Sequence, residues 1–232
     1  MNQKIIVVTG ASQGIGLAIV KRFLKDNQNN KIIMVGRESD SFKNILKTLK
    51  SEYKNEIIEI FADFSKINDI KRLVKQIILC TNQIDVLVNN AGYTKPESFL
   101  NACVNDFRHT MEINLISPFV LIQDLMKSGI HPKKIINIAS TSGIGARPGW
   151  LTYAASKAAM ISMSDTLREE LKVFGTDVIC ISPGRCATNL RKILAPDEDP
   201  STIMQPENVA NIVLYLSSED GKYLTSHNLI VR

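Results

Sequence analysis

Hydrophobic runs alternate with amphipathic stretches along the whole chain. Seven short runs are rich in Ile and Val, and most are continuously apolar, which is typical of strands in a parallel sheet buried on both faces. Longer segments with apolar residues at helical spacing separate most of these runs. The predicted strands are Lys4–Thr9, Lys31–Val35, Ile57–Ala62, Val86–Asn89, Ile135–Ala139, Val178–Ser182 and Asn228–Val231. The predicted helices are Ile15–Asp26, Ser41–Lys54, Lys66–Leu79, Val104–Met126, Leu151–Phe174 and Pro206–Leu216.

The repeated strand–helix units favour an α/β fold. We expect a doubly wound, mainly parallel seven-stranded sheet with helices on both faces and right-handed crossovers. A chain of 232 residues is of ordinary length for one α/β domain, so residues 1–232 are predicted to form a single domain. The acidic, Pro-rich stretch Ala195–Ser201 is interpreted as part of a surface loop, because too little chain follows it for a second domain.

Composition and charge narrow the possible partners. With 44% hydrophobic and 22% charged residues, the chain is neither disordered nor a disulfide-dense miniprotein. The net charge is +5, but Lys43, Lys47, Lys50 and Lys54 recur on one helical face, which is typical of a solvated helix. Because no aromatic residues interleave a basic groove, we expect no nucleic-acid partner.

The cysteines and the apolar runs indicate the compartment. The four cysteines form no C-x-x-C pair and no Cys/His cluster with zinc spacing, so we expect free thiols and no metal site. No apolar run approaches the about 20 residues that span a bilayer. The segment Ile5–Ala11 enters a Gly-rich turn rather than a signal-peptide cleavage site. A cytoplasmic protein with no membrane partner is predicted.

A Gly-rich turn, Thr9–Gly16, joins the first predicted strand to the first predicted helix. Glycines at such a junction allow a tight turn and let the backbone approach a pyrophosphate at the helix N-terminus. The spacing is G-x-x-x-G-x-G rather than the commoner G-x-G-x-x-G, and glycine-rich turns alone are a weak signal. The strand–turn–helix context is what predicts a dinucleotide site.

The end of the second strand bears on which dinucleotide binds. Gly36 stands where an NAD-binding chain carries an acid, and Arg37 follows it. The guanidinium fork of Arg matches a 2′-phosphate, so NADP is the predicted cofactor. NAD stays possible, because Glu38 could pair with Arg37 or hold the ribose itself.

Three polar residues suggest proton chemistry. Tyr153 and Lys157 share one helical face at an i, i+4 spacing. A neighbouring ammonium would lower the phenol pKa from its reference value of about 10, and a tuned phenol exchanges a proton with a carbonyl or alcohol oxygen. Ser140, at the end of the fifth strand, would orient the same oxygen and stabilise developing charge. A Y-x-x-x-K pattern alone is common by chance.

Taken together, these motifs resemble those of the short-chain dehydrogenases/reductases, of the single-domain kind that includes 3-oxoacyl-carrier-protein reductases and carbonyl reductases. Thr9–Gly16 matches the family's T-G-x-x-x-G-x-G, Asn89–Gly92 its N-N-A-G and Tyr153–Lys157 its Y-x-x-x-K, in the same order over nearly the whole chain. The resemblance implies a Rossmann-type fold and an NADP-dependent oxidoreductase that interconverts a carbonyl and an alcohol.

The resemblance also implies roles for individual residues. Tyr153 would be the general acid or base, Lys157 would hold the nicotinamide ribose and lower the Tyr153 pKa, and Ser140 would polarise the carbonyl. Asn114 would support a water that relays protons to Lys157. The implied cofactor-binding residues are Gly10, Ser12, Gln13, Gly14, Ile15, Gly16, Arg37, Asp63, Phe64, Asn90, Ala91, Gly92, Tyr153, Lys157, Pro183, Gly184 and Thr188.

For the substrate pocket, the resemblance implies Thr94, Ser142, Trp150 and Arg185. Arg185 could meet a substrate anion or pair with an acidic loop residue such as Asp197. The loop from Asn189 to Gln205 is short, which disfavours a large lid and favours small or open-ended carbonyl substrates. His109, His131 and His227 form no cluster and receive no role.

Two departures from the family pattern leave alternatives open. Gln13 replaces a basic residue that many NADP-preferring relatives carry. The helices Val104–Met126 and Leu151–Phe174 match the family's dimer-forming helices, which predicts a homo-oligomer. In relatives an Asp-Gly-Gly tail often helps to form the tetramer interface, and here the chain instead reads Val231-Arg232 at the end of the last strand. Both a homodimer and a homotetramer therefore stay open. The main alternative function is a non-catalytic, dinucleotide-binding redox sensor, which loss of the Tyr, Lys or Ser would have favoured.

Overall fold

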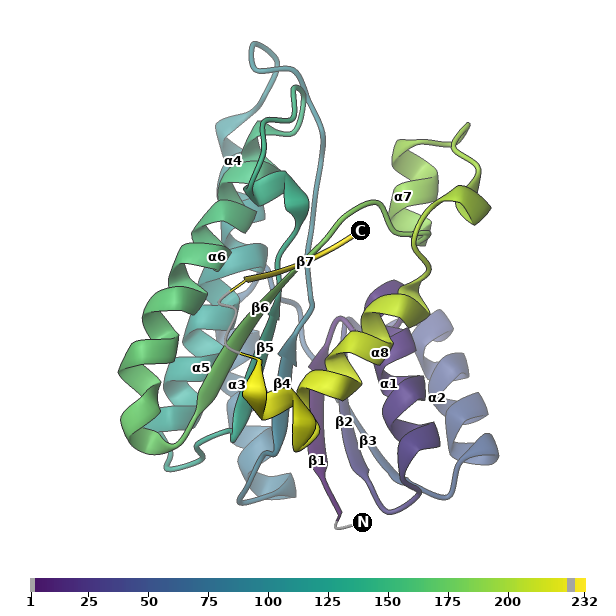
Figure 1. Cartoon of the computed structure of the whole chain (residues 1–232), viewed down its shortest axis with the longest axis vertical. Coiled ribbons are helices and arrows are strands. Elements are labelled where there is room, and N and C mark those ends of the chain that lie inside the picture. The colour runs from purple at the N-terminus through teal and green to yellow at the C-terminus, as the bar shows by residue number, and fades with distance from the viewer. Residues whose placement is uncertain (1–2, 225–227) are drawn as a thin grey trace.

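The computed structural model describes residues 3–224 and 228–232. Within these residues, seven strands form one sheet in the order β3-β2-β1-β4-β5-β6-β7, and every neighbouring pair is parallel (Figure 1). The predicted doubly wound parallel sheet is therefore confirmed. The strands are β1 (Ile5–Thr9), β2 (Lys31–Gly36), β3 (Glu56–Phe61), β4 (Val86–Asn89), β5 (Lys134–Ile138), β6 (Asp177–Pro183) and β7 (Asn228–Val231).

Helices cover both faces of the sheet (Figure 1). Side chains of α1, α2 and α8 pack on one face, and side chains of α3, α5 and α6 pack on the other. The helices are α1 (Gly14–Asp26), α2 (Asp40–Glu52), α3 (Ile67–Cys80), α4 (Val104–Met111), α5 (Ser117–Lys127), α6 (Leu151–Leu171), α7 (Asn189–Leu194) and α8 (Pro206–Leu216).

The central strand β1 explains why the apolar runs are continuous. Ile6 and Val8 point toward α1 and α8, whereas Ile5 and Val7 point toward the helices of the opposite face. All four side chains are buried, because successive residues of a strand face opposite sides and both sides are covered. Burial of this kind, at roughly 25 cal/mol per Å² of apolar surface, is the main force that holds the layers together.

The predicted helix Val104–Met126 is interrupted by a π-helical turn, Glu112–Ile116, between α4 and α5. Pro118 has no N–H to donate to the carbonyl of Asn114, so the regular hydrogen-bond ladder cannot continue at this position. The single-helix prediction was wrong at this point. The turn matters because Asn114 belongs to it.

The predicted loop Asn189–Gln205 is also corrected, because it contains α7 and a short 3₁₀ turn, Pro200–Thr202. Thr188 caps α7, and its hydroxyl accepts a hydrogen bond of 3.2 Å from the backbone N–H of Arg191. Figure 1 shows α7 beyond the carboxyl ends of the strands, on the side of α8.

Two remaining expectations concern the chain as a whole. No helix within residues 3–224 and 228–232 combines the length and apolar character needed to cross a membrane. His227, which the sequence left without a role, lies outside the described residues.

Candidate active site

A large cleft lies where the strand order reverses between β1 and β4. In parallel α/β sheets, ligands bind at this reversal, beyond the carboxyl ends of the strands. The cleft has a volume of about 790 Å³. All the site residues predicted from the sequence line it except Gly16 and Asn114, which are buried behind its wall.

The Gly-rich turn is joined to the end of β4 by what we call the Thr9–Asn90 lock. The Thr9 hydroxyl accepts 3.0 Å hydrogen bonds from the backbone N–H groups of Asn90 and Ala91. The Asn90 amide in turn donates to the carbonyls of Thr9 and Gly10, at 3.0 and 3.2 Å. A Cβ at Gly10 would lie 2.9 Å from the Ala91 Cα, and one at Gly16 would collide with the Gly10 carbonyl. Glycine is therefore required at both positions.

The N-terminus of α1 is open toward the cleft. The backbone of Gln13 is extended and its side chain does not cap the helix, while the first turn contains no acidic residue. Ser12, Gln13, Gly14 and Ile15 line the cleft. Uncapped N–H groups and the positive end of the helix dipole suit a pyrophosphate, so the residues present fit a dinucleotide.

The other end of the cleft fits a 2′-phosphate. Gly36 is buried, and a Cβ there would lie 3.1 Å from the ring of Phe42, so the acid that holds an NAD ribose would fit only if this ring moved. Arg37 is exposed and lines the cleft. Glu38 pairs with Lys43 at 2.6 Å, and the predicted alternative of a Glu38–Arg37 pair is not what the structure contains.

Asp63 and Phe64 line the cleft beside Arg37. The Asp63 carboxylate accepts hydrogen bonds from the backbone N–H and the hydroxyl of Ser65, at 3.0 and 2.8 Å. Burial alone would raise the pKa of Asp63, but these bonds and the charges of Lys66 and Arg37 hold it below its ordinary value. Asp63 is consequently an anion and a hydrogen-bond acceptor at neutral pH.

Ser140 and Tyr153 come together at the centre of the cleft. Ser140 follows β5, and Tyr153 lies in the first turn of α6. Burial raises the pKa of Tyr153, while the side-chain hydrogen bond with Ser140 and the charge of Arg147 lower it to a smaller extent. The predicted lowering of the Tyr153 pKa by Lys157 was therefore wrong, because burial outweighs the favourable charges.

Lys157 lies one turn further along α6, with its ammonium 5.7 Å from the centre of the Tyr153 ring. The Nζ atom donates a 2.8 Å hydrogen bond to the Ile138 carbonyl at the end of β5. Burial lowers the pKa of Lys157 to about 8. An amine in this range changes its protonation state near physiological pH, which suits a group that passes protons.

Asn114 ties the segment after β4 to α6. Its side-chain oxygen accepts from the Tyr93 N–H at 2.7 Å, and its amide nitrogen donates to the Tyr93 carbonyl and the Ser156 hydroxyl, both at 2.9 Å. Both polar ends of this fully buried amide are thus engaged within the protein. Asn114 holds the wall of the cleft next to Gly92, where a Cβ would lie 3.8 Å from the Lys157 ammonium.

The segment after β6 closes the cleft from the side of α7. Pro183, Gly184 and Thr188 line it, and a Cβ at Gly14 would lie 3.3 Å from the Thr188 methyl group. Arg185 pairs with an acidic loop residue, as one of the two alternatives predicted. Its partner is Glu198, at 2.9 Å, rather than Asp197. Glu198 also accepts two hydrogen bonds from Arg191, and these partners lower its pKa to about 2.

Several residues of the site were not predicted from the sequence. Gly143 packs on α6 so closely that a Cβ would lie 2.6 Å from the backbone of Lys157 and Ala158, and its position three residues after Ser140 was the available signal. His109 lines the cleft with its ring edge-on to Tyr93 at 4.7 Å, but an isolated His carries no pattern. Further unpredicted lining residues are Ser39, Ser41, Leu190, Arg191 and Leu194.

A parallel sheet with a Gly-rich turn at the strand reversal, beside the set of Ser140, Tyr153 and the buried Lys157, defines a dinucleotide-dependent oxidoreductase. A family model for short chain dehydrogenases matches residues 4–199. The chain belongs to the short-chain dehydrogenase/reductase family, and it is an NADP-dependent oxidoreductase.

Known proteins similar to this chain include a curated 3-oxoacyl-acyl-carrier-protein reductase of Rickettsia prowazekii. It is 30% identical over 238 residues, which cover 98% of this chain and 95% of the relative. The structure of L-sorbose reductase from Gluconobacter frateurii, complexed with NADPH and L-sorbose, has a TM-score of 0.88 at 25% identity and covers 99% of this chain and 95% of its own. A blue fluorescent protein from a metagenomic library, in complex with NADPH, has a TM-score of 0.85 at 30% identity, covering 98% and 96%.

Proposed function

We propose that this chain reduces a ketone or aldehyde to an alcohol with NADPH, or runs the reverse reaction, with Tyr153 as the proton donor or acceptor. One observation carries the proposal: Ser140 and Tyr153 both line the cleft, their side chains interact there, and the Lys157 ammonium lies 5.7 Å from the centre of the tyrosine ring. Two hydroxyls placed in this way can both bond to one carbonyl oxygen.

The cofactor would lie along the cleft. The open N-terminus of α1 would hold the pyrophosphate, Arg37 the 2′-phosphate and Asp63 the adenine end. Gly92, Lys157 and Thr188 line the part of the cleft nearest Tyr153 and would contact the nicotinamide half. When bound there, NADPH supplies the hydride or NADP accepts it.

The residues of this chain then handle the proton. The raised pKa keeps the Tyr153 hydroxyl protonated at neutral pH, ready to donate to the carbonyl oxygen as it gains charge. The Ser140 hydroxyl stabilises the same oxygen. Lys157, with a pKa of about 8, can replace the proton that Tyr153 gives up. A protonated Tyr153 favours reduction at neutral pH, whereas alcohol oxidation requires its deprotonated form and is expected to accelerate as the pH rises.

The substrate would be a small carbonyl compound or alcohol. Thr94, Ser142, Trp150 and Arg185 line the cleft and are the proposed substrate contacts. The similar 3-oxoacyl-acyl-carrier-protein reductase and L-sorbose reductase support a carbonyl substrate but leave its size open.

The proposal also covers assembly and location. The exposed side chains of Val104, Ile116 and Phe119 on the α4–α5 segment support a homodimer or homotetramer formed through these helices. All four cysteines are free, which supports the cytoplasm. One domain spanning residues 1–232 is the proposed organisation, because β1 and β7 belong to the same sheet.

The test is NADPH oxidation against a panel of ketones, diketones and 3-oxoacyl thioesters, with Tyr153→Phe in parallel. Loss of the acid hydroxyl should lower kcat by about a hundredfold or more, because general acid catalysis contributes on that order. NADPH binding, followed by its fluorescence, should stay nearly unchanged. Tyr215→Phe, on an exposed tyrosine of α8, is the matched control.

Undiminished turnover in Tyr153→Phe would refute the assignment. Tight NADPH binding by the wild type without turnover of any panel compound would favour the redox-sensor alternative.

A further inference from the structure

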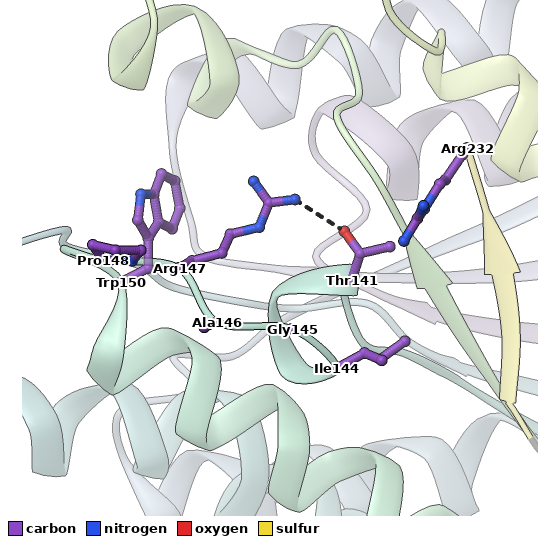
Figure 2. A pocket seen from close by; sticks show the side chains of 8 residues that line it. All are labelled: Thr141, Ile144, Gly145, Ala146, Arg147, Pro148, Trp150 and Arg232. Carbon is purple, nitrogen blue, oxygen red and sulfur yellow. Dashed lines mark hydrogen bonds between the residues drawn. The ribbon is translucent and has the colours of Figure 1, made fainter.

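A second cavity, of about 400 Å³, opens beside Tyr153. Its walls come from the turn between β5 and α6 and from the end of β7 (Figure 2). Two of its lining residues are arginines, Arg147 and Arg232, and none is acidic. Figure 2 shows the two side chains approaching Thr141 from opposite sides of the cavity. The side chains that line the cavity therefore contribute positive charge and no negative charge.

Neither guanidinium is neutralised within the described part of the chain, where no carboxylate lies at ion-pair distance from Arg147 or Arg232. The hydrogen bond of Arg147 is a long one, 3.4 Å to the neutral hydroxyl of Thr141. The nearby Arg185 and Arg191 differ, because both bond to Glu198. Two unpaired guanidiniums facing one cavity are an arrangement that an anionic ligand would stabilise.

Both arginines are positioned by the fold. Arg232 follows β7, whose Val231 pairs with Pro183 of β6 and accepts a 2.8 Å hydrogen bond from the N–H of Gly184. A Cβ at Gly184 would lie 3.5 Å from the Arg232 side chain, so this arginine packs against the turn that borders the cleft. Arg147 precedes α6 by a few residues and lines both the cavity and the cleft.

The cavity adjoins the cleft, because Thr141, Arg147 and Trp150 line both. The ring of Trp150 lies edge-on to that of Tyr153 at 5.8 Å. The charge of Arg147 acts on the Tyr153 hydroxyl. A molecule whose carbonyl oxygen bonds to Ser140 and Tyr153 can thus extend into the cavity.

We propose that this cavity binds an anionic group of the substrate, so that the preferred substrate is a ketone or hydroxy compound bearing a carboxylate or a phosphate. The inference rests on the proposed function and adds the substrate class to it. An uncharged acyl chain placed here would cover two guanidiniums without supplying a counter-charge, which is unfavourable. A carboxylate or phosphate would accept hydrogen bonds from both.

The kinetic test uses matched pairs of ketones that differ in charge: levulinate against its ethyl ester, and dihydroxyacetone phosphate against dihydroxyacetone. In the wild type we expect kcat/KM to be about tenfold or more higher for the charged member of at least one pair, since hydrogen bonds to charged groups are worth that much. Arg147→Gln and Arg232→Gln should each reduce this ratio, and the double variant should bring it close to one. The pair with the larger ratio distinguishes a carboxylate from a phosphate.

The control variant is Arg72→Gln, which removes an exposed arginine of α3 that is paired with Asp69 and is not among the residues lining the cleft. It should leave the ratio unchanged. A ratio insensitive to Arg147→Gln and Arg232→Gln would overturn the inference. Equal sensitivity to Arg72→Gln would also overturn it, because the preference would then reflect the net charge of the protein.

A binding readout separates this inference from the proposed function. Trp150 is the only tryptophan of the chain and lies in the cavity wall, so its fluorescence can follow titration of the NADP-loaded protein with succinate or inorganic phosphate. Saturable binding that the double variant loses would support the anion site even if no ketone were turned over. Turnover of neutral ketones that depends on Tyr153, with no charge preference and no anion binding, would uphold the proposed function and refute the anion site.

Discussion

Lys157 is held in the fold at a measurable cost in stability. Its side chain is buried, and burial lowers its pKa from 10.5 to about 8. At about 1.4 kcal/mol for each pKa unit, keeping this lysine protonated in the folded protein costs about 3 kcal/mol relative to the unfolded chain. Below pH 8 the lysine is protonated in both the folded and the unfolded state, so the full cost applies. Between pH 8 and 10.5 the unfolded chain binds the proton and the folded protein does not, so this cost disappears as the pH rises.

Lys157→Met should therefore stabilise the protein at pH 7 while abolishing turnover. The variant removes the buried charge but also the 2.8 Å hydrogen bond to the Ile138 carbonyl, whose loss costs about 1 kcal/mol. The net expectation is a gain of about 2 kcal/mol in the free energy of unfolding at pH 7. At pH 11 only the lost hydrogen bond remains, and the variant should be less stable than the wild type by about 1 kcal/mol.

The assay is urea unfolding of the wild type and the variant from pH 6 to pH 11, without cofactor so that binding adds nothing to stability. Lys47→Met, on the exposed face of α2, controls for the loss of a charge in general. A difference in stability between the wild type and Lys157→Met that stays constant with pH would refute the reasoning. The reasoning would also be refuted if the stability of the variant fell furthest below that of the wild type at pH 7.

Two further predictions concern the cofactor and the catalytic turn. Arg37→Gln should raise KM for NADPH by about tenfold or more and leave KM for NADH nearly unchanged, because only NADPH carries the phosphate; an equal change for both cofactors would contradict the 2′-phosphate assignment. Gly143→Ala places a Cβ 2.6 Å from the backbone of α6, so it should lower kcat and also lower the unfolding free energy by about 1–3 kcal/mol. Gly145→Ala is the control, because a Cβ there meets nothing within 4 Å, and it should change neither quantity. Equal thermal unfolding curves for the two variants would show that the close packing is unimportant.

The strands could be predicted from the sequence because their signal is local. Val86–Asn89 and Asn228–Val231 have the same bounds in the structure as in the prediction, and the reversal between β1 and β4 follows from the usual rules of parallel sheets. The Gly-rich turn and the Tyr153–Lys157 spacing are equally local signals, and nearly all the predicted site residues line the cleft.

What could not be predicted depends on contacts between distant segments. The helix α7 is short, and its stability comes from Thr188 and from Glu198 bound to two arginines, none of which a hydrophobic pattern reveals. The Tyr153 pKa was predicted in the wrong direction because burial, which sequence spacing does not report, exceeds the effect of neighbouring charges.

The Thr9–Asn90 lock has a consequence for how the chain folds. It joins residues 81 positions apart, whereas β1 and β2 pair after a far shorter connection. Contacts between distant residues form slowly, because the entropy of closing a long loop is lost before the contact rewards it. The first strands can associate early, but the Gly-rich turn takes its binding shape only when β4 has docked beside β1. Substitutions at Thr9 or Asn90 should therefore accelerate unfolding more than they slow folding, and they should also weaken the cofactor site.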